Sequence, residues 1–277
     1  MWQYMTGAYR GENVTRYEIA VPHLPRGGTL TIALISDIHA ARWFMPPERV
    51  ARIVAHTNAL GADLIAIGGD ISAEDNRWQV PVPLEDTARL LAGLRAPLGV
   101  FAVPGNHDWW DDAATQPFGD GPPAMVDVFA RHGLPVLQNE GRRLDHGGVD
   151  LWLAGLDSRE AHRRPGRRHV GRHDMGAALA GRPVGALTVL LAHEPDSFAE
   201  APPDVDLTLS GHTHGGQITV FGRPLTAPTD HGYTYGLFRE GARHLVVSGG
   251  LGCSKGPFRF GVMPEIVLVT LTGAEPG

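Results

Sequence analysis

LTIALIS at residues 30–36 is a short apolar run with strand character, and the segment that follows it, residues 46–60, places its apolar side chains on one helical face. Two more apolar runs, DLIAIGG at 63–69 and GVFAV at 99–103, flank a second helical pattern at 84–94. This strand–helix–strand–helix–strand order predicts a parallel sheet with helices on its faces. Ligands of such sheets bind beyond the carboxyl ends of the strands, so we expect the functional side chains there.

The second half of the chain is richer in strand patterns. After a helical segment at 123–132, apolar runs with few helices between them occur at 150–156, 187–192, 206–210, 217–221, 244–248 and 266–271. They predict a second sheet packed on the first. No Pro/Ser-rich linker or long charge run divides the chain, so we expect a single domain over residues 1–277, with an N-terminal extension at 1–29 and an Arg-rich loop at 158–173.

Composition narrows the class of protein. The chain has 277 residues, is 43 % apolar and carries a formal net charge of −6, so it can bury a sizeable core and is not expected to form a stable nucleic-acid complex. Its single cysteine, Cys253, excludes an internal disulfide and a thiolate-rich metal site. No transmembrane segment is expected, because every apolar run is far shorter than the roughly 20 residues that a membrane helix needs. We therefore expect a cytoplasmic protein, or a membrane-associated or exported one if an N-terminal segment has been removed.

Five short polar motifs follow apolar runs at predicted strand ends. They are Ser36-Asp37-Ile38-His39, Gly68-Gly69-Asp70, Gly105-Asn106-His107-Asp108, Ala192-His193-Glu194 and Gly211-His212-Thr213-His214-Gly215. Together they bring carboxylates, an amide oxygen and imidazoles to one edge of a sheet, a donor set that suits Mn, Fe, Co or Zn. The pairs Asp37/His39 and His212/His214 would each point to one side if the chain is extended there. Helix capping by Asp37 and Asp70 is the simpler alternative, but it does not predict all five motifs in one chain.

The order DIH, GGD, GNHD, H and GHTH resembles the calcineurin-like metallophosphoesterases over roughly residues 30–271, and GHTHGGQ at 211–217 is most similar to their bacterial YkuE/YaeI-like branch. The resemblance implies an α/β fold, a layered α/β/β/α sandwich with two packed mixed sheets. It also implies two metal ions, Mn, Fe, Zn or Co, that share the carboxylate of Asp70. The implied ligands are Asp37, His39, Asp70 and His214 for one ion, and Asp70, Asn106, His193 and His212 for the other.

The same resemblance implies an activity. We expect a metal-dependent phosphoesterase that hydrolyses a phosphodiester or a pyrophosphate bond with a water molecule held between the metals. His107 is expected to be a catalytic residue rather than a ligand, because it contacts the phosphoryl group or protonates the leaving oxygen. Asp108 is a candidate to orient His107. The alternatives are a phosphomonoesterase with the same core and a non-catalytic scaffold of this fold, and the presence of His107 argues against the scaffold.

Two features suggest how a substrate is held. The segment SREAHRRPGRRHVGRH at 158–173 contains six arginines, Arg163 and Arg164 among them, and a single acid, Glu160. It is either an anion-docking loop or a solvated insertion. Trp109, next to Trp110, either stacks on a base or sugar or packs in the core. The expected partner is accordingly a small-molecule phosphoester, a nucleotide or a lipid-linked substrate.

Overall fold

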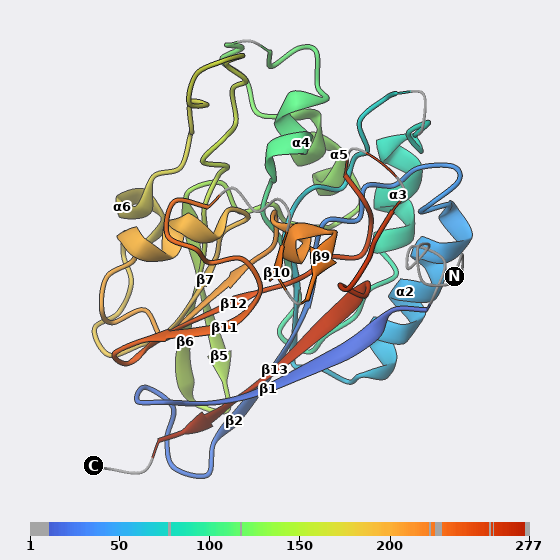
Figure 1. The fold of residues 1–277 in the computed structure, drawn as a ribbon. Coiled ribbons are helices and arrows are strands. Elements are labelled where there is room, and N and C mark those ends of the chain that lie inside the picture. Colours follow the sequence, from blue (N-terminus) through green and yellow to red (C-terminus); the bar gives the residue numbers. More distant parts are fainter. Residues whose placement is uncertain are drawn as a thin grey trace.

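The computed structural model describes residues 11–76, 79–116, 118–221, 223–224, 229–254, 256 and 258–274, and it contains two mixed sheets (Figure 1). The first sheet has the strand order β1 (Asn13–Val21), β13 (Glu265–Gly273), β2 (Thr29–Ile35), β3 (Leu64–Ile67) and β4 (Val100–Ala102). The second has the order β11 (Gly236–Glu240), β12 (Arg243–Val247), β8 (Leu207–Ser210), β7 (Leu187–Leu191), β6 (Val149–Gly155) and β5 (Glu140–His146). In the first sheet β2, β3 and β4 are parallel, and in the second β6, β7, β8 and β12 are parallel.

Both faces of the first sheet are covered, which explains the continuous apolar runs of its central strands. Ala33 and Ile35 of β2 pack towards the helices α2 (Pro47–Ala59), α3 (Leu84–Leu91) and α5 (Ala124–Arg131). Ile32 and Leu34 of the same strand point the other way, into a core shared with the second sheet. Successive strand residues point to opposite faces, so one run supplies both packing layers.

The outer face of the second sheet carries a thinner layer. It consists of α6 (Met175–Ala178) and the 3₁₀ turn η2 (Pro195–Glu200), which pack on β6, β7 and β12. In Figure 1, α2 and α3 lie on one side of the molecule and α6 lies on the other. The order of layers is therefore helices, sheet, sheet, helices, and the predicted α/β/β/α sandwich is confirmed.

Apart from the two-residue strand β10, three strands are not indicated by the sequence pattern. β1 lies in the predicted N-terminal extension and pairs in parallel with β13, so this part of the extension belongs to the first sheet; residues 1–10 lie outside the described part of the chain. β5 and β11 are edge strands in which every residue is at least partly exposed, so neither has the apolar run of a buried strand. The strand predicted at 217–221 is shorter, because only β9 (Thr219–Val220) is formed, in a hairpin with β10 (Arg223–Pro224).

Candidate metal centre

The polar motifs meet where the strands of the two sheets end. Asp37 and His39 follow β2, Asp70 follows β3, Asn106 and His107 lie in the short helix α4 (Asn106–Trp110) after β4, His193 follows β7, and His212 and His214 follow β8. All of them are buried except His212, which is partly exposed. Residues from both sheets therefore form one buried cluster of oxygen and nitrogen donors.

One group of donors contains Asp37, His39 and His214. The Nε2 atoms of His39 and His214 lie 3.1 Å apart, and Nε2 of His214 lies 3.4 Å from Asp37 Oδ1. Each of the three residues offers a ligand atom within 4.8 Å of the others. Burial lowers the pKa of His39 to about 3 and also holds the pKa of His214 well below its usual range. Both imidazoles are therefore neutral at pH 7, as metal ligation requires.

Asp70 links this group to a second one. Its Oδ2 atom lies 3.5 Å from Nε2 of His39 and 3.2 Å from Nε2 of His193. Nearby, Nδ1 of His212 is 2.8 Å from Oδ1 of Asn106. Burial raises the pKa of Asp70, but the neighbouring imidazoles, His193 first, outweigh it and hold the pKa well below its usual range. A carboxylate that stays ionised between two groups of donors is what two neighbouring cations need as a shared ligand.

The second nitrogens of two imidazoles show that the donors suit a cation. Nδ1 of His39 lies 3.1 Å from the carbonyl oxygen of Ser72, and Nδ1 of His193 lies 2.6 Å from that of Gly68. A carbonyl oxygen only accepts, so each Nδ1 carries a proton and each Nε2 is directed towards Asp70. Burial lowers the pKa of His193, but the charge of Asp70 outweighs burial and holds that pKa well above its usual range. Nε2 of His193 is buried and has no hydrogen-bond partner among the described residues. A metal ion would take the place of a proton on Nε2 and bind both the imidazoles and the carboxylate.

The backbone of the site is strained. Eight described residues other than glycine have positive φ, and five of them are predicted ligands: Asp37 (52°), His39 (44°), Asp70 (54°), His212 (70°) and His214 (52°). The chain is therefore not extended at Asp37/His39 or at His212/His214, and the condition on which each pair was expected to face one side is not met. Each pair lies beyond its strand in left-handed backbone, a conformation that L-residues rarely adopt and that tends to cluster at functional sites.

Glycine is required where the chain passes Asp70. A Cβ atom on Gly105 would collide with the carboxylate and the backbone amide of Asp70. With no Cβ in the way, Asp70 Oδ1 accepts a hydrogen bond of 2.8 Å from the amide of His107. The glycine before Asn106 thus brings α4 up against the central carboxylate.

The residue that orients His107 is not the one expected. Asp108 faces away from the imidazole and accepts hydrogen bonds from the amides of Asp70 (2.8 Å), Ile71 (2.9 Å) and Gly105 (2.9 Å). Oδ2 of Asp111 lies 3.0 Å from Nδ1 of His107 instead. The prediction for Asp108 is wrong because side chains one residue apart diverge on a helix, whereas residues four apart share a face.

The two tryptophans after GNHD have different environments. Trp109 is fully buried and its indole N–H donates to Asp157 Oδ1 at 2.8 Å, so the core-packing alternative describes it and no face is left to stack on a substrate. Trp110 is partly exposed, with its ring centroid 5.3 Å from that of His107. Trp110, rather than Trp109, is the aromatic residue beside the centre.

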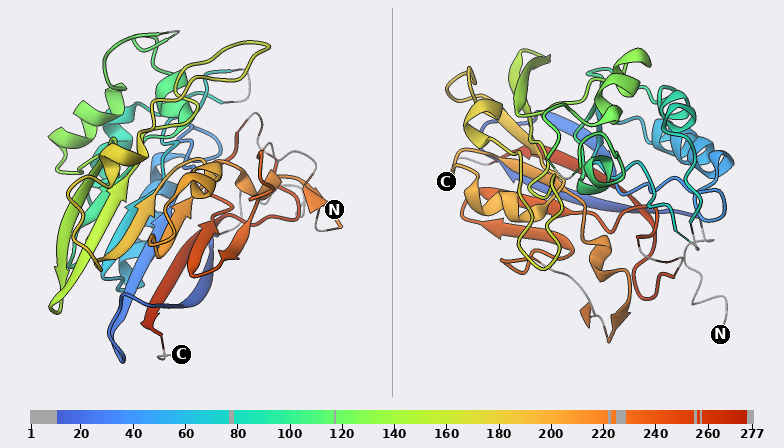
Figure 2. Two further views of the ribbon diagram at one scale, coloured as in Figure 1. Left: turned by 90° about the vertical axis from the view of Figure 1, so that its left-hand side faces the viewer. Right: turned by 90° about the horizontal axis from the view of Figure 1, so that it is seen from above.

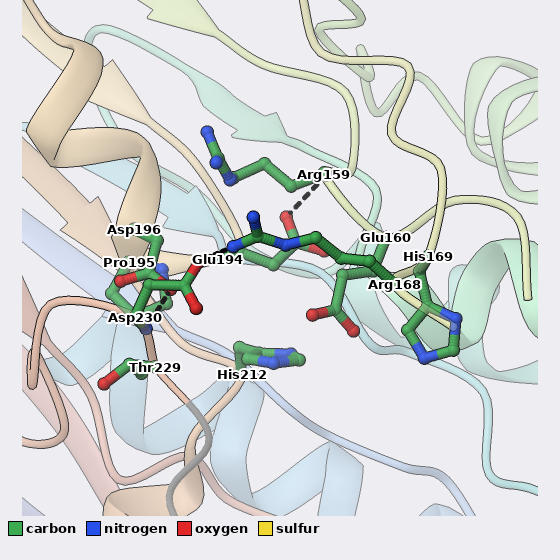
Figure 3. A pocket seen from close by; sticks show the side chains of 10 residues that line it. All are labelled: Arg159, Glu160, Arg168, His169, Glu194, Pro195, Asp196, His212, Thr229 and Asp230. Atoms are coloured by element: carbon green, nitrogen blue, oxygen red, sulfur yellow. Dashed lines mark hydrogen bonds and ion pairs between the residues drawn. The ribbon is translucent and has the colours of Figure 1, made fainter. Parts of the chain in front are cut away.

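The Arg-rich loop lies against the same side of the centre. The guanidinium of Arg163 lies over the Trp110 ring, 4.6 Å from its centroid, and that of Arg164 lies 5.4 Å from the centroid of Phe118. A cavity of about 60 Å³ lies between this loop and His212. Figure 3 shows the Arg168 side chain extended across it towards Asp230, with which it forms an ion pair, and the ring of His212 faces the same space.

Two residues of the site gave no clear signal in the sequence. Arg259 is 1 % exposed and donates to the carbonyl oxygens of Gly252 and Gly249 (2.7 Å each), while its Nη2 lies 3.0 Å from Nδ1 of His214. Glu194, in the His193 motif, accepts hydrogen bonds from the Ser158 hydroxyl and the Arg159 amide, and so fixes the start of the Arg-rich loop beside the centre. Arg259 lies 45 residues from His214 in sequence, so only the fold brings the two together.

The family model for calcineurin-like phosphoesterases matches residues 30–216 of this chain, a range that contains all seven predicted ligands and His107. The chain belongs to the calcineurin-like metallophosphoesterase family. It is 30 % identical to the uncharacterised metallophosphoesterase YkuE of Bacillus subtilis over 93 % of this chain and 84 % of that protein. An uncharacterised metallophosphoesterase of Aquifex aeolicus is also 30 % identical, over 94 % of this chain and 92 % of that one.

Some relatives of this metallophosphoesterase are longer. The bovine transmembrane protein with metallophosphoesterase domain is 31 % identical over 94 % of this chain, which spans only 57 % of the bovine protein. In the described part of the present chain, no helix is long and apolar enough to cross a membrane.

Proposed function

We propose that this metallophosphoesterase hydrolyses a phosphodiester or pyrophosphate bond and that His107 assists the leaving group. The observation that best supports the proposal is the position of Asp70, which lies between two groups of donors while the amide of His107 donates to its other oxygen. One ion would be held by Asp37, His39, Asp70 and His214, and the other by Asp70, Asn106, His193 and His212. When bound, the two ions would polarise the phosphoryl group and activate a water molecule.

His107 is suited to give a proton. Burial lowers its pKa, but the charges of Asp70 and Asp111 outweigh burial and raise the pKa above its usual value. Asp111 accepts a hydrogen bond from the N–H group at Nδ1, so the ring is held in one orientation and Nε2 is the atom that can protonate a leaving oxygen. A general acid is useful for esters with alkoxide or phosphate leaving groups, which depart poorly as free anions.

The substrate is expected to extend towards the Arg-rich loop. Trp110 lies between His107 and Arg163, so the loop borders the side of the centre where His107 would meet the leaving group. We propose that Arg163 and Arg164 bind a further anionic group of the substrate, such as a second phosphate of a nucleotide or a lipid headgroup. Cation–π contacts hold both guanidinium groups in place, and Arg163 also forms an ion pair of 3.8 Å with Glu74 that an anionic group of the substrate would compete with.

The reaction class can be tested with two aryl esters. Protein purified without added metal is analysed for its metal content, loaded with Mn, Fe, Zn or Co, and assayed on bis-p-nitrophenyl phosphate and p-nitrophenyl phosphate. The proposal predicts a higher kcat/KM for the diester. Preference for the monoester would identify a phosphomonoesterase, and no hydrolysis by the metal-loaded protein would indicate a non-catalytic member of the family.

A further inference from the structure

One ion pair spans the cavity beside the metal centre. The left-hand view of Figure 2 shows the Arg-rich loop as a hairpin that projects beyond the ends of the strands. From this hairpin the Arg168 side chain extends over the cavity of about 60 Å³ that His212 faces, and it pairs with Asp230 on the far side. Ligand pockets are usually about 300 Å³ or larger, so the ion pair leaves room only for a small group next to the centre.

The two partners of this ion pair differ in how firmly they are held. The amides of Asp230 and His231 donate to Asp196, at 2.8 Å and 3.2 Å, so the backbone that carries Asp230 is fixed. Arg168 has a long side chain and is 78 % exposed, and Asp230 is 55 % exposed. An exposed ion pair contributes little to stability. Arg168 can therefore leave Asp230 at small cost when another partner is present.

The cavity contains further hydrogen-bonding groups that are free to bind a ligand. Nδ1 of His169 accepts a hydrogen bond of 3.0 Å from the amide of Arg164, so the neutral ring carries its proton on Nε2 and can donate from there. Oγ1 of Thr229 is buried and has no hydrogen-bond partner among the described residues. Because buried polar groups normally have a partner, this hydroxyl also indicates that a polar group binds here.

The charges around the cavity indicate the chemistry of that group. Of the other acids that line it, Glu194 accepts from a hydroxyl and an amide, Asp196 accepts from two amides, and the Glu160 carboxylate has no partner among the described residues. The cavity therefore does not attract anions by its overall charge. A guanidinium group only donates and is always charged, so the group that replaces Asp230 must be a negatively charged acceptor in direct contact with Arg168.

We propose that Arg168 exchanges Asp230 for an anionic group of the bound substrate, and so selects substrates that carry a negative charge directly beside the phosphoryl group at the metal centre. A phosphate group suits this exchange, because its oxygens match the donors of a guanidinium. The inference rests on the phosphoesterase reaction proposed above and adds a specificity-determining residue to it. Arg163 and Arg164 lie over aromatic rings, whereas Arg168 lies over the cavity itself.

Two substrates that differ by one phosphate test the exchange. They are diadenosine diphosphate (AppA) and adenylyladenosine (ApA), and the measurement is the ratio of kcat/KM for AppA to kcat/KM for ApA. Arg168→Ala should lower this ratio by about tenfold or more. Asp230→Asn should raise it by about two- to fivefold, because it removes the carboxylate that competes for Arg168. Arg167→Ala is the matched control, since Arg167 does not line the cavity, and it should leave the ratio unchanged.

The double variant separates the exchange from other roles of the ion pair. If Asp230 acts through Arg168, adding Asp230→Asn to Arg168→Ala should not change the ratio further. A ratio that rises equally in the presence and absence of Arg168 would show that Asp230 acts by its charge alone, and would overturn the proposal. A ratio that falls in both single variants would show that the ion pair only stabilises the loop. An unchanged ratio in Arg168→Ala would also overturn the proposal.

Binding of an analogue that cannot be hydrolysed separates this inference from the reaction class. Isothermal titration of the metal-loaded proteins with the methylene analogue of AppA should give the highest affinity for Asp230→Asn, then the wild type, then Arg168→Ala. This order without hydrolysis of bis-p-nitrophenyl phosphate would support the exchange and contradict the reaction class. Equal affinities, or no binding by the wild type, in a protein that hydrolyses this diester would overturn the exchange alone.

Discussion

Oδ2 of Asp111 lies 3.0 Å from Nδ1 of His107, and the two residues are four positions apart around the short helix α4. The contact fixes the imidazole beside the centre and, with the charge of Asp70, raises the pKa of His107 against the opposing effect of burial. The same helix begins at Asn106, a predicted ligand. The helix and its C-cap therefore carry a predicted metal ligand, the proposed proton donor and the carboxylate that contacts the donor.

His107→Ala should lower kcat by about 10²- to 10⁴-fold and leave both metals bound, because the imidazole acts on the leaving group rather than on the ions. The loss should be smaller for a p-nitrophenyl ester than for an alkyl or nucleoside ester, since the aryl oxide departs without protonation. Steady-state kinetics on the matched esters and elemental analysis measure both effects. Loss of one metal equivalent would show that His107 is a ligand. An equal decrease of kcat on both esters would show that His107 donates a hydrogen bond and does not protonate the leaving group.

Asp111→Asn should show the same leaving-group dependence with a smaller loss of kcat. The amide can still contact Nδ1 of His107 but no longer stabilises the protonated ring. The pH profile of kcat on the alkyl ester should lose activity at lower pH than in the wild type, because the pKa of His107 falls when the negative charge is removed. An unchanged profile would show that Asp111 has only a structural role.

Arg163→Ala combined with Arg164→Ala should raise KM for a large anionic substrate, such as a dinucleotide pyrophosphate, by roughly tenfold or more and leave KM for bis-p-nitrophenyl phosphate unchanged. Arg142→Ala combined with Arg143→Ala is the matched control, because these arginines lie on the edge strand β5 and pair with Glu140 and Asp150. Equal effects of the Arg163/Arg164 variant on both substrates would show that these two arginines stabilise the loop and do not bind substrate.

The fold could be predicted where burial dictates the sequence. Both faces of strand β2 pack against apolar core residues, and the apolar run at 30–36 was therefore enough to predict the strand. The edge strand β5, EGRRLDH, is held by backbone pairing with β6 and has no apolar pattern to detect. Side chains of an edge strand can stay in water, so its composition carries little information about its conformation.

Some features of the candidate site could likewise be predicted from the sequence, and others could not. The residue types and their order were enough to select seven residues that the fold brings together, but not their backbone conformation, because left-handed φ values at residues such as Asp37 and His214 depend on contacts made after folding. Arg259 and Asp111 were missed for a related reason. Arg259 contacts His214 and Asp111 contacts His107, and neither contact follows from the local sequence pattern.

Gly105→Ala should weaken metal binding without unfolding the protein, because its Cβ would displace the Asp70 carboxylate. Gly121→Ala is the matched control, since nothing lies within 4 Å of a Cβ at that position. Isothermal titration of the metal-free proteins should show an affinity loss of about tenfold or more for Gly105→Ala only. Equal affinities for the two variants would contradict the close approach at Asp70.

Asp157 should make stability depend on pH between about 4 and 6. Burial raises its pKa to about 6, although the Ser158 amide and the Trp109 indole donate to it. In the unfolded chain the pKa of Asp157 is about 3.9. The folded protein is therefore most stable below pH 3.9, where Asp157 is protonated in both states. Its free energy of unfolding falls by up to about 3 kcal/mol as the pH rises through 6.

Asp157→Asn removes this dependence, because the amide does not ionise. The free energy of unfolding of Asp157→Asn relative to wild type should therefore increase from pH 4 to pH 7, as measured by urea unfolding with a chelator present. A constant difference between the two proteins over this range would contradict the raised pKa of Asp157.

The central claim is that Asp70 joins two metal sites, and elemental analysis of the wild type and Asp70→Asn, purified and metal-loaded in parallel, tests it most directly. The substitution removes the charge that two cations share and keeps the size of the side chain. We predict close to two metal equivalents in the wild type, and in Asp70→Asn the loss of at least one equivalent and of most activity, with an unchanged circular dichroism spectrum. An Asp70→Asn protein that retains two metals and normal turnover would contradict the claim.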